Sequence, residues 1–232
     1  MAEIVYLDSP LESVALYERL CPPVRKWFKD KFPDFTRPQK LAIPAIMEKQ
    51  HLLLCSPTGS GKTLTAFLTV IDQLVRLALE RKLEKKVHAI YISPIKALAN
   101  DIQRNLIGPL NEITEHYLPD RAQEIRVGLR TGDTSQSDRQ KMLRNPPHIL
   151  ITTPESLAIA ITSPRFQPIV SEVEYMIIDE LHSMVSTKRG VHLSLTLSLL
   201  DSLLMNPVQR IGISATMEPL ETVAEYLVSS DD

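Results

Sequence analysis

The sequence predicts an α/β fold, in which a mostly parallel sheet carries helices on both faces. Short apolar runs rich in β-forming residues alternate along the chain with longer segments of helical periodicity. Several of these runs are apolar at nearly every position, as expected for strands that are buried on both faces. Strands and helices in repeated alternation form crossovers between parallel strands. Ligands on such sheets bind at the carboxyl ends of the strands.

Six apolar runs are predicted to form strands: Leu52–Cys55, Val87–Ser93, Ile125–Leu129, His148–Thr152, Val173–Ile178 and Arg210–Ser214. Six longer segments are predicted to form helices: Lys62–Leu83, Lys96–Ile113, Ser135–Arg144, Pro154–Ile161, Val191–Leu204 and Pro219–Leu227. In the first of these helices the large apolar side chains recur at helical spacing, which favours one face packed on the sheet.

The first fifty residues hold two further helical patterns, Pro23–Lys31 and Arg37–Glu48, joined by a turn around Pro33. We interpret residues 1–50 as a helical cap on the main domain, which spans residues 51–232. Trp27, Phe28 and Phe35 in this cap have two interpretations, either stacking on a nucleobase or packing in the core.

Composition restricts the possible partners and the compartment. The formal net charge is −2, so no global basic field favours nucleic acid, and any such binding is expected to be local. Cys21 and Cys55 lack metal-binding spacing and suit a reducing compartment, which predicts a cytoplasmic protein. The amino-terminal residues do not resemble a signal peptide, and no apolar run approaches the roughly 18 residues of a membrane span. No membrane partner is therefore expected.

The stretch SPTGSGKT follows the first predicted strand and precedes the first long helix. It meets the phosphate-loop pattern GxxxxGK[ST] in a relaxed form, with Ser56 in place of the first glycine. Glycines let backbone N–H groups surround phosphate, and the following helix adds its positive dipole end. The residues predicted to hold the nucleotide are Pro57, Thr58, Gly59, Ser60, Gly61, Lys62 and Thr63. Lys62 would reach the β- and γ-phosphates, and the Thr63 hydroxyl would bind Mg²⁺. The alternative is a flexible Gly/Ser turn.

The stretch MIIDELH places two acids at the end of an apolar strand. Asp179 is predicted to hold Mg²⁺, through water because this ion keeps much of its hydration. Glu180 is the candidate base or orienting group for the attacking water. His182 would link the nucleotide state to another motif. The alternatives are a solvated strand end for the acids and an ordinary turn position for His182.

With both phosphate motifs present, the chain resembles the motor domain of superfamily 2 helicases, which is RecA-like in fold, and DELH is similar to the DExH members. FTRPQ resembles the Q motif, which implies that Gln39 reads the adenine and that Arg37 also binds the nucleotide. SPIKALAND resembles motif Ia, RTGDT and TTPESL resemble two further strand-gripping motifs, and SAT resembles motif III. The resemblance implies nucleic-acid contacts from Pro94, Lys96, Ala97, Gly132, Asp133, Thr153, Pro154, Glu155 and Ser156. It implies coupling between sites through His182, Ser214 and Thr216.

The combination of ISPIKALAND, RTGDT, NPPHILITTPESL, DELH, STKRG and ISATMEPLETVAEYL is similar to Lhr-type helicases of archaea and bacteria. Hel308-like and Ski2-like helicases share much of this layout. The resemblance implies ATP and Mg²⁺ as cofactors and translocation on nucleic acid, with DNA and 3′-to-5′ polarity favoured. RNA stays an alternative substrate, because a backbone grip carries little base information.

Local chemistry also suits these roles. Pro94 and Pro154 fit a first helical turn, and Thr153 fits an N-cap. Helix N-termini bind backbone phosphates without reading bases, and Lys96 would add a mobile charge. The alternative is ordinary strand-to-helix connection chemistry, and Ser214 with Thr216 would then only cap the last helix. Residues 187–190 are interpreted either as a strand contact or as a solvated loop.

Superfamily 2 helicases use two RecA-like domains with ATP between them, and this chain reaches Asp232 soon after the motif III segment. We therefore expect one motor domain whose partner is a second RecA-like domain. Alone it would bind ATP and nucleic acid weakly, hydrolyse slowly for lack of an arginine finger, and not unwind. The competing functions are a single-domain nucleotide-dependent binding module and another phosphate-loop class, such as a nucleotide kinase or an ABC-type ATPase.

Overall fold

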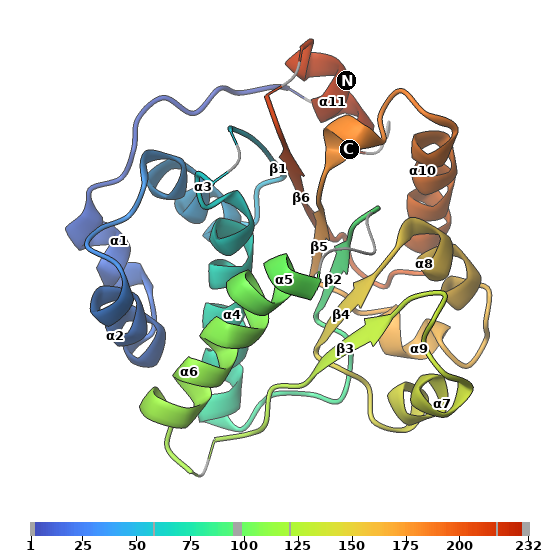
Figure 1. The fold of residues 1–232 in the computed structure, drawn as a ribbon, viewed down its shortest axis with the longest axis horizontal. Helices are drawn as coiled ribbons and strands as arrows, with labels where there is room; N and C mark the ends of the chain where they lie inside the picture. The colour runs from blue at the N-terminus through green and yellow to red at the C-terminus, as the bar shows by residue number, and fades with distance from the viewer. Residues whose placement is uncertain (1–2, 58, 95–98, 121, 217, 229–232) are drawn as a thin grey trace.

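A six-stranded sheet forms the centre of the folded domain (Figure 1). The computed structural model describes residues 3–57, 59–94, 99–120, 122–216 and 218–228. The strand order is β1-β6-β5-β2-β4-β3, and every neighbouring pair is parallel. The predicted α/β class is confirmed, and the sheet is parallel at each described pairing.

The strands lie where the apolar runs predict them. They are β1 Leu52–Cys55, β2 Ala89–Ile92, β3 Val127–Arg130, β4 Ile149–Thr152, β5 Tyr175–Ile178 and β6 Gln209–Ser214. The predicted runs for β2, β3 and β5 begin too early. Val87 and Val173 are buried ahead of the ladder, so their apolar character reflects core packing and not strand pairing.

Helices account for most of the remaining chain. The amino-terminal set is α1 Ser13–Arg19, α2 Pro22–Lys31, α3 Arg37–Met47, α4 Lys62–Glu80, α5 Ala99–Ile102, the π-helix η2 Gln103–Ile107 and α6 Gly108–Tyr117. The later set is α7 Gln136–Arg144, α8 Pro154–Ile161, α9 Gln167–Val170, the 3₁₀ turn η3 Leu181–Ser183, α10 Lys188–Asp201 and α11 Leu220–Leu227. The short helices α1 and α9 were not predicted. None of the described helices is long and apolar enough to cross a membrane.

The prediction of one continuous helix over 96–113 is wrong, because the segment is interrupted by a π-helical turn and ends later, at Tyr117. Residues 96–98 lie outside the described part of the chain, and the rest divides into α5, η2 and α6. Pro109 lies in the first turn of α6 and has no N–H to donate to the preceding turn. The π-type turn of η2 directly before it accommodates that missing bond.

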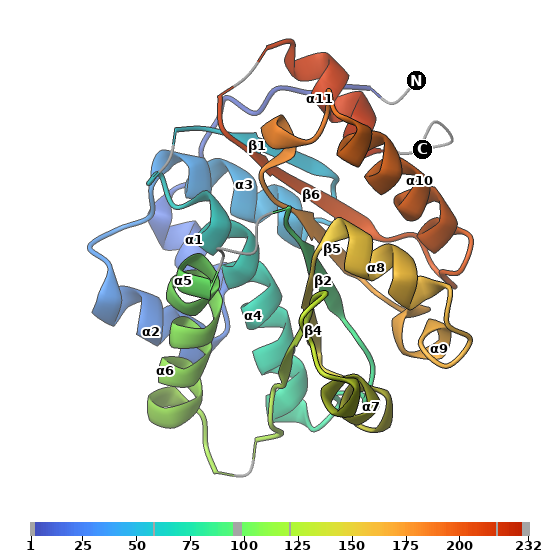
Figure 2. The same cartoon turned by 45° about the vertical axis from the view of Figure 1, so that its right-hand side comes forward.

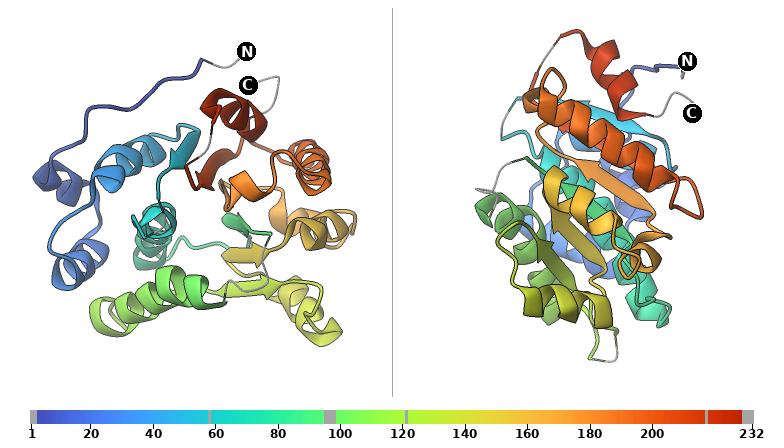
Figure 3. Two further views of the ribbon diagram at one scale, coloured as in Figure 1. Left: turned by 45° about the horizontal axis from the view of Figure 1, so that its top comes forward. Right: turned by 90° about the vertical axis from the view of Figure 1, so that its right-hand side faces the viewer.

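The two faces of the sheet carry separate sets of helices. In β5, Ile177 packs in the cluster that contains α2, α3 and α4, whereas Met176 and Ile178 pack in the cluster that contains α8 and α10. This alternation follows from the two-residue period of a strand. Figures 2 and 3 show α1–α6 on one side of the sheet and α8–α10 on the other.

The amino-terminal helices share a core with the rest of the domain. Phe28 stacks on Phe35 with ring centroids 4.2 Å apart, and Trp27 contacts Phe28 at 6.2 Å. All three rings are buried. Their core interpretation is therefore confirmed, and stacking of these rings on a nucleobase is wrong.

Helix α10 begins earlier than the predicted start at Val191. The Thr187 side chain accepts a hydrogen bond from Gly190 N and so caps a helix whose first residue is Lys188. Gly190 lies against the preceding turn, because a Cβ built on it would be 2.2 Å from Met184 O. The interpretation of residues 187–190 as a solvated loop is therefore wrong, and their contact with a nucleic-acid strand stays a prediction.

This close approach makes Gly190 a point of steric constraint. Gly190→Ala is expected to lower the free energy of unfolding by about 1–3 kcal/mol, because the new methyl group meets a backbone oxygen that cannot move alone. Gly132→Ala is the matched control, since a Cβ there has no heavy atom within 4 Å. Urea unfolding of both variants measures the difference, and equal stabilities would contradict the proposed constraint.

Candidate functional site

The parallel register brings the predicted site residues to one edge of the sheet. Cys55 at the end of β1 lies opposite Ser214 of β6, and Ile178 of β5 lies opposite Ile92 of β2. Ile92 in turn pairs with Thr152 of β4. The loops that follow these strands therefore emerge side by side, with the phosphate-loop motif and the strand-gripping motifs in different halves of the same edge.

The loop between β1 and α4 has the backbone that an anion cradle requires. Gly59 and Gly61 have φ values of 81° and 83°, in the left-handed region that glycine adopts without steric cost. Gly61 is the N-cap of α4, whose first residues are Lys62 and Thr63. Thr58 lies outside the described residues. Successive N–H groups and a helix N-terminus thus meet in one loop.

The ammonium of Lys62 lies over this loop. Its Nζ donates to Pro57 O at 2.8 Å and also to Ser56 O. Burial lowers the pKa of Lys62, and the carboxylates of Asp179 and Glu180 oppose that shift. The lysine therefore links the phosphate-binding loop electrostatically to the acids that follow β5.

Asp179 is a buried carboxylate held by two donors. Tyr91 of β2 donates its hydroxyl to Oδ2 at 2.5 Å, and the backbone N–H of Glu180 donates to Oδ1 at 2.7 Å. Burial raises the pKa of Asp179, while both hydrogen bonds favour its ionised form. Tyr91 was not predicted as a site residue, because its partner lies 88 positions away along the chain.

Glu180 turns the chain sharply after the strand. Its φ of 56° is in the left-handed region, which a residue with a Cβ rarely adopts and which stores strain. The carboxylate Oε2 lies 3.1 Å from His182 Nε2. The two adjacent acids therefore have different environments, one buried under Tyr91 and one beside an imidazole.

His182 joins the turn after β5 to the turn after β6. Its Nδ1 accepts the backbone N–H of Ala215 at 3.0 Å and lies 3.3 Å from Ser214 Oγ. An acceptor role for Nδ1 assigns the ring proton to Nε2, which then donates to Glu180. The structure thus brings His182 and Ser214 together. Thr216, two residues after Ser214, is exposed. Neither Ser214 nor Thr216 caps α11, because the N-cap of that helix is Pro219.

The Q-motif-like segment lies against the phosphate loop. Gln39 is buried, and its Oε1 accepts the Thr36 N–H at 2.8 Å, which caps α3. A Cβ built on Gly61 would lie 3.3 Å from Gln39 Nε2, and Thr36 Oγ1 donates to Ser60 O at 3.4 Å. The structure therefore places Gln39 beside the loop, with its carbonyl used in the cap.

Arg37 has a different location from Gln39. It is exposed, and its guanidinium donates to Asp8 O at 3.4 Å, in the extended amino-terminal segment.

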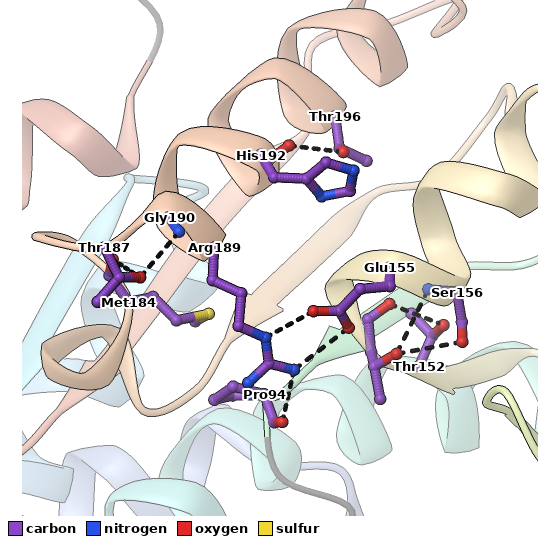
Figure 4. Close-up of polar contacts among 11 residues, drawn as sticks. Pro94, Thr152, Glu155, Ser156, Met184, Thr187, Arg189, Gly190, His192 and Thr196 are labelled. Atoms are coloured by element: carbon purple, nitrogen blue, oxygen red, sulfur yellow. Dashed lines mark hydrogen bonds and ion pairs between the residues drawn. The ribbon is translucent and has the colours of Figure 1, made fainter.

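The strand-gripping candidates form a second group, shown in Figure 4. Thr153 Oγ1 accepts the Ser156 N–H at 3.3 Å and donates to Ser156 Oγ at 3.1 Å, so the predicted N-cap is confirmed. Pro154 occupies the first turn of α8, as predicted. These contacts fix the amino end of α8 at the end of β4.

Glu155 has a protein partner that the sequence did not reveal. Arg189 of α10 donates from Nε to Glu155 Oε1 at 2.5 Å and from Nη2 to Oε2 at 3.2 Å. The same Nη2 donates to Pro94 O at 2.7 Å, directly after β2. The hydrogen bond from Arg189 lowers the pKa of Glu155, so this carboxylate is ionised and paired.

The remaining strand-gripping candidates are less defined. Gly132 and Asp133 lie exposed in the turn after the edge strand β3, where Thr134 Oγ1 accepts the Thr131 N–H at 2.8 Å. Arg139 of α7 donates to Gly132 O at 3.2 Å. Lys96 and Ala97 lie outside the described residues.

The donor set fits a nucleoside triphosphate with Mg²⁺. The left-handed glycines, the Lys62 ammonium and the α4 amino end suit phosphate oxygens. The half-buried Thr63 hydroxyl and the Asp179 carboxylate are oxygen ligands of the kind Mg²⁺ prefers. Within the described part of the chain no group of three His, Cys, Asp or Glu residues forms a complete metal site, so phosphate and water would supply the other ligands.

Comparison with known proteins agrees with this geometry. Residues 36–225 match the family described as DEAD/DEAH box helicase. The chain belongs to the DEAD/DEAH box helicase family. The superfamily resemblance seen in the motifs is thereby confirmed, and the Lhr-type resemblance is supported by a relative in Methanocaldococcus jannaschii. That protein, ATP-dependent helicase Lhr-Core, is 50% identical over 99% of this chain and 27% of its own length.

Solved helicase structures share the fold. The structure of Mycobacterium smegmatis helicase Lhr bound to ssDNA and AMP-PNP matches 91% of this chain and 27% of that chain, with a TM-score of 0.82 and 45% identity. The DEAD-box helicase Mss116 matches with a TM-score of 0.75 at 20% identity, which concerns the fold alone. The predicted RecA-like architecture is confirmed. This DEAD/DEAH box helicase chain spans 27% of the length of the Methanocaldococcus relative and 27% of the Mycobacterium chain.

Asp179 gives a pH prediction with a definite sign. Burial raises its pKa, so the folded chain keeps this proton at pH values where an unfolded Asp, with a pKa of about 4, has lost it. The contribution of Asp179 to the free energy of unfolding therefore falls as pH rises from about 4 through the raised folded pKa. Asp179→Asn removes this fall and is expected to be more stable than wild type at neutral pH.

Urea unfolding across this pH range measures the effect, with Asp120→Asn at an exposed loop position as the control. The new amide can keep both contacts, with its Oδ1 accepting the Glu180 N–H and its Nδ2 donating to the Tyr91 oxygen. A lower stability of Asp179→Asn than of wild type at neutral pH would show that ionised Asp179 does not destabilise the fold.

Proposed function

We propose that this chain is the ATP-binding motor domain of an ATP-dependent DNA helicase of Lhr type. The observation that carries the proposal is the shared edge of the sheet. The phosphate loop follows β1, the DELH turn follows β5 and the Thr153–Ser156 turn follows β4, so all three lie at the same edge of the sheet. The relatives' names, and the ssDNA and AMP-PNP in the Mycobacterium structure, support ATP as the nucleotide and DNA as the strand.

In this proposal the chain's own groups bind and orient ATP. Lys62 and the amides of the glycine loop hold the β- and γ-phosphates. Thr63 and Asp179 hold Mg²⁺, which when bound neutralises charge on the phosphate oxygens. Glu180 accepts a hydrogen bond from the attacking water and orients it toward the γ-phosphate. Gln39, beside Gly61, contacts the adenine.

Tyr91 has a supporting role in the same site. Its hydroxyl donates to Asp179 and favours the ionised carboxylate, which burial alone would disfavour. This hydrogen bond therefore opposes the rise in the pKa of Asp179 that burial causes.

The coupling route in this proposal runs through His182. The imidazole contacts Glu180 on one side and the turn at Ser214 and Ala215 on the other. A shift of Glu180 during hydrolysis would therefore reach the loop after β6, where Thr216 is exposed.

The proposed strand grip uses backbone groups and hydroxyls at the ends of β2, β3 and β4. Pro94, Thr153 and Ser156 are the described residues placed there, with Gly132 and Asp133 at the edge strand. Contacts of this kind bind phosphate and sugar without reading bases. DNA is favoured over RNA because of the Lhr relatives.

A second RecA-like domain is the proposed partner. In phosphate-loop motors an arginine finger is worth about 10³–10⁵ in rate, and the proposed source of that arginine is this partner. We therefore expect weak nucleotide binding, slow hydrolysis and no unwinding by this chain alone. Cytoplasmic location is also proposed, and the free thiols of Cys21 and Cys55 support it.

The phosphate chemistry is tested by two variants with separate outcomes. Lys62→Ala is expected to weaken ATP binding by about tenfold or more, because a charged hydrogen-bond donor to phosphate is lost. Glu180→Gln is expected to keep ATP binding and to lower turnover by about 100-fold or more, because water is no longer oriented by a base.

Equilibrium binding of a fluorescent ATP analogue and release of inorganic phosphate measure these two effects. Lys85→Ala and Glu225→Gln, both at exposed positions, are the matched controls. Turnover by Glu180→Gln equal to that of wild type would remove Glu180 from the mechanism. ATP binding unaffected by Lys62→Ala would overturn the phosphate-cradle proposal.

A further inference from the structure

Arg189 connects three segments that are distant in sequence. It lies in the first turn of α10 and donates to the Glu155 carboxylate at the start of α8 through two nitrogens. It also donates to Pro94 O at the end of β2, 95 positions away. Figure 4 shows the guanidinium between Glu155 and Pro94. A planar fork can satisfy two such acceptors at once.

The base of this side chain is held firmly. Thr187 caps α10, and the Thr187 hydroxyl donates to Met184 O at 2.8 Å. Gly190 packs directly against the Met184 carbonyl, and Tyr226 donates its hydroxyl to Gly190 O at 2.6 Å. The backbone beside Arg189 is therefore fixed to the turn that follows DELH and to α11.

The ion pair between Arg189 and Glu155 contributes little to the stability of the fold. The side chains of Arg189 and Glu155 are 43% and 48% exposed. An exposed ion pair contributes about 0–1 kcal/mol, so the contact adds little to the free energy of unfolding. Its position at the strand-gripping edge of the sheet suggests a different use.

We propose that Arg189 is a positioning residue for the nucleic-acid strand. Arg189 fixes the distance between the backbone at Pro94 and the amino end of α8. Polar groups at both places can then contact the same nucleic-acid strand. Glu155 is then the anchor of Arg189 and does not itself contact the strand. This inference rests on the proposed nucleic-acid function, and it adds a residue outside the strand-gripping motifs recognised in the sequence.

Direct contact between Arg189 and a phosphate is the competing explanation, and it has a different signature. Loss of one phosphate contact reduces the slope of log affinity against log salt concentration by about 1. Loss of a positioning contact leaves that slope unchanged. Removal of the Glu155 charge also separates the two, because it weakens a positioning contact but releases a direct phosphate contact.

The test measures binding of a fluorescein-labelled oligodeoxythymidine to the 232-residue chain by anisotropy over a salt series. Arg189→Gln is expected to weaken binding by about tenfold, with an unchanged salt slope, because charge-assisted contacts are lost. Arg189→Lys is expected to recover only part of this loss, since a point charge cannot bind both acceptors as the fork does. Lys188→Gln, at the exposed neighbouring position, is the control for net charge.

A double-mutant cycle completes the test. In a Glu155→Gln background, Arg189→Gln is expected to cost less than about threefold, because its anchor is already weakened. Binding of a fluorescent ATP analogue and the thermal midpoint should stay close to wild type in every variant, whereas a merely structural role would change both.

Each other outcome counts against a defined statement. A full tenfold loss in the Glu155→Gln background, a reduced salt slope, or complete rescue by Arg189→Lys would overturn positioning in favour of direct contact. Wild-type affinity in Arg189→Gln would overturn the inference and leave the proposed function intact. Absence of oligonucleotide binding by the wild type would overturn both the strand-binding proposal and this inference.

Discussion

The parallel register of the sheet is the constraint on which the site depends. Because β1, β6, β5, β2, β4 and β3 all run in one direction, every strand ends at the same edge. The pairing of Ile178 with Ile92, and of Ile92 with Thr152, then sets the acid-bearing turn and the α8 turn one strand apart on either side of β2. A slip of one residue would move Ile177 to the face of the α8–α10 core and Ile178 to the face of the α2–α4 core, which would break both cores.

The cores and the site are coupled through β2. Tyr91 lies in the core cluster that contains α2, α3 and α4, with its ring centroid 4.9 Å from that of Phe67. Its hydroxyl donates to Asp179. The ring therefore supplies apolar area to the core and one hydrogen bond to the site. The buried acid that this arrangement supports is unfavourable for folding and suited to a metal, as expected where function and stability conflict.

The sequence predicted most of the fold because the signals are local. Most of the buried strands are apolar at nearly every position, and the loop before Lys62 carries a dense glycine motif. The start of α10 was missed because its cap depends on a tight approach to the Met184 carbonyl. The partnerships of Tyr91 with Asp179 and of Arg189 with Glu155 join residues 88 and 34 positions apart, and no local pattern encodes such pairs.

The left-handed backbone at Glu180 has a consequence for the entropy of catalysis. The corner fixes the direction of the carboxylate during folding, and the imidazole of His182 holds its far end. A flexible carboxylate would lose conformational entropy at each turnover, whereas Glu180 has already lost it in the folded chain. The backbone strain at Glu180 is offset by the stability of the rest of the fold. In the proposed mechanism, a carboxylate prepared in this way needs little rearrangement to orient water once the nucleotide and the proposed partner domain are bound.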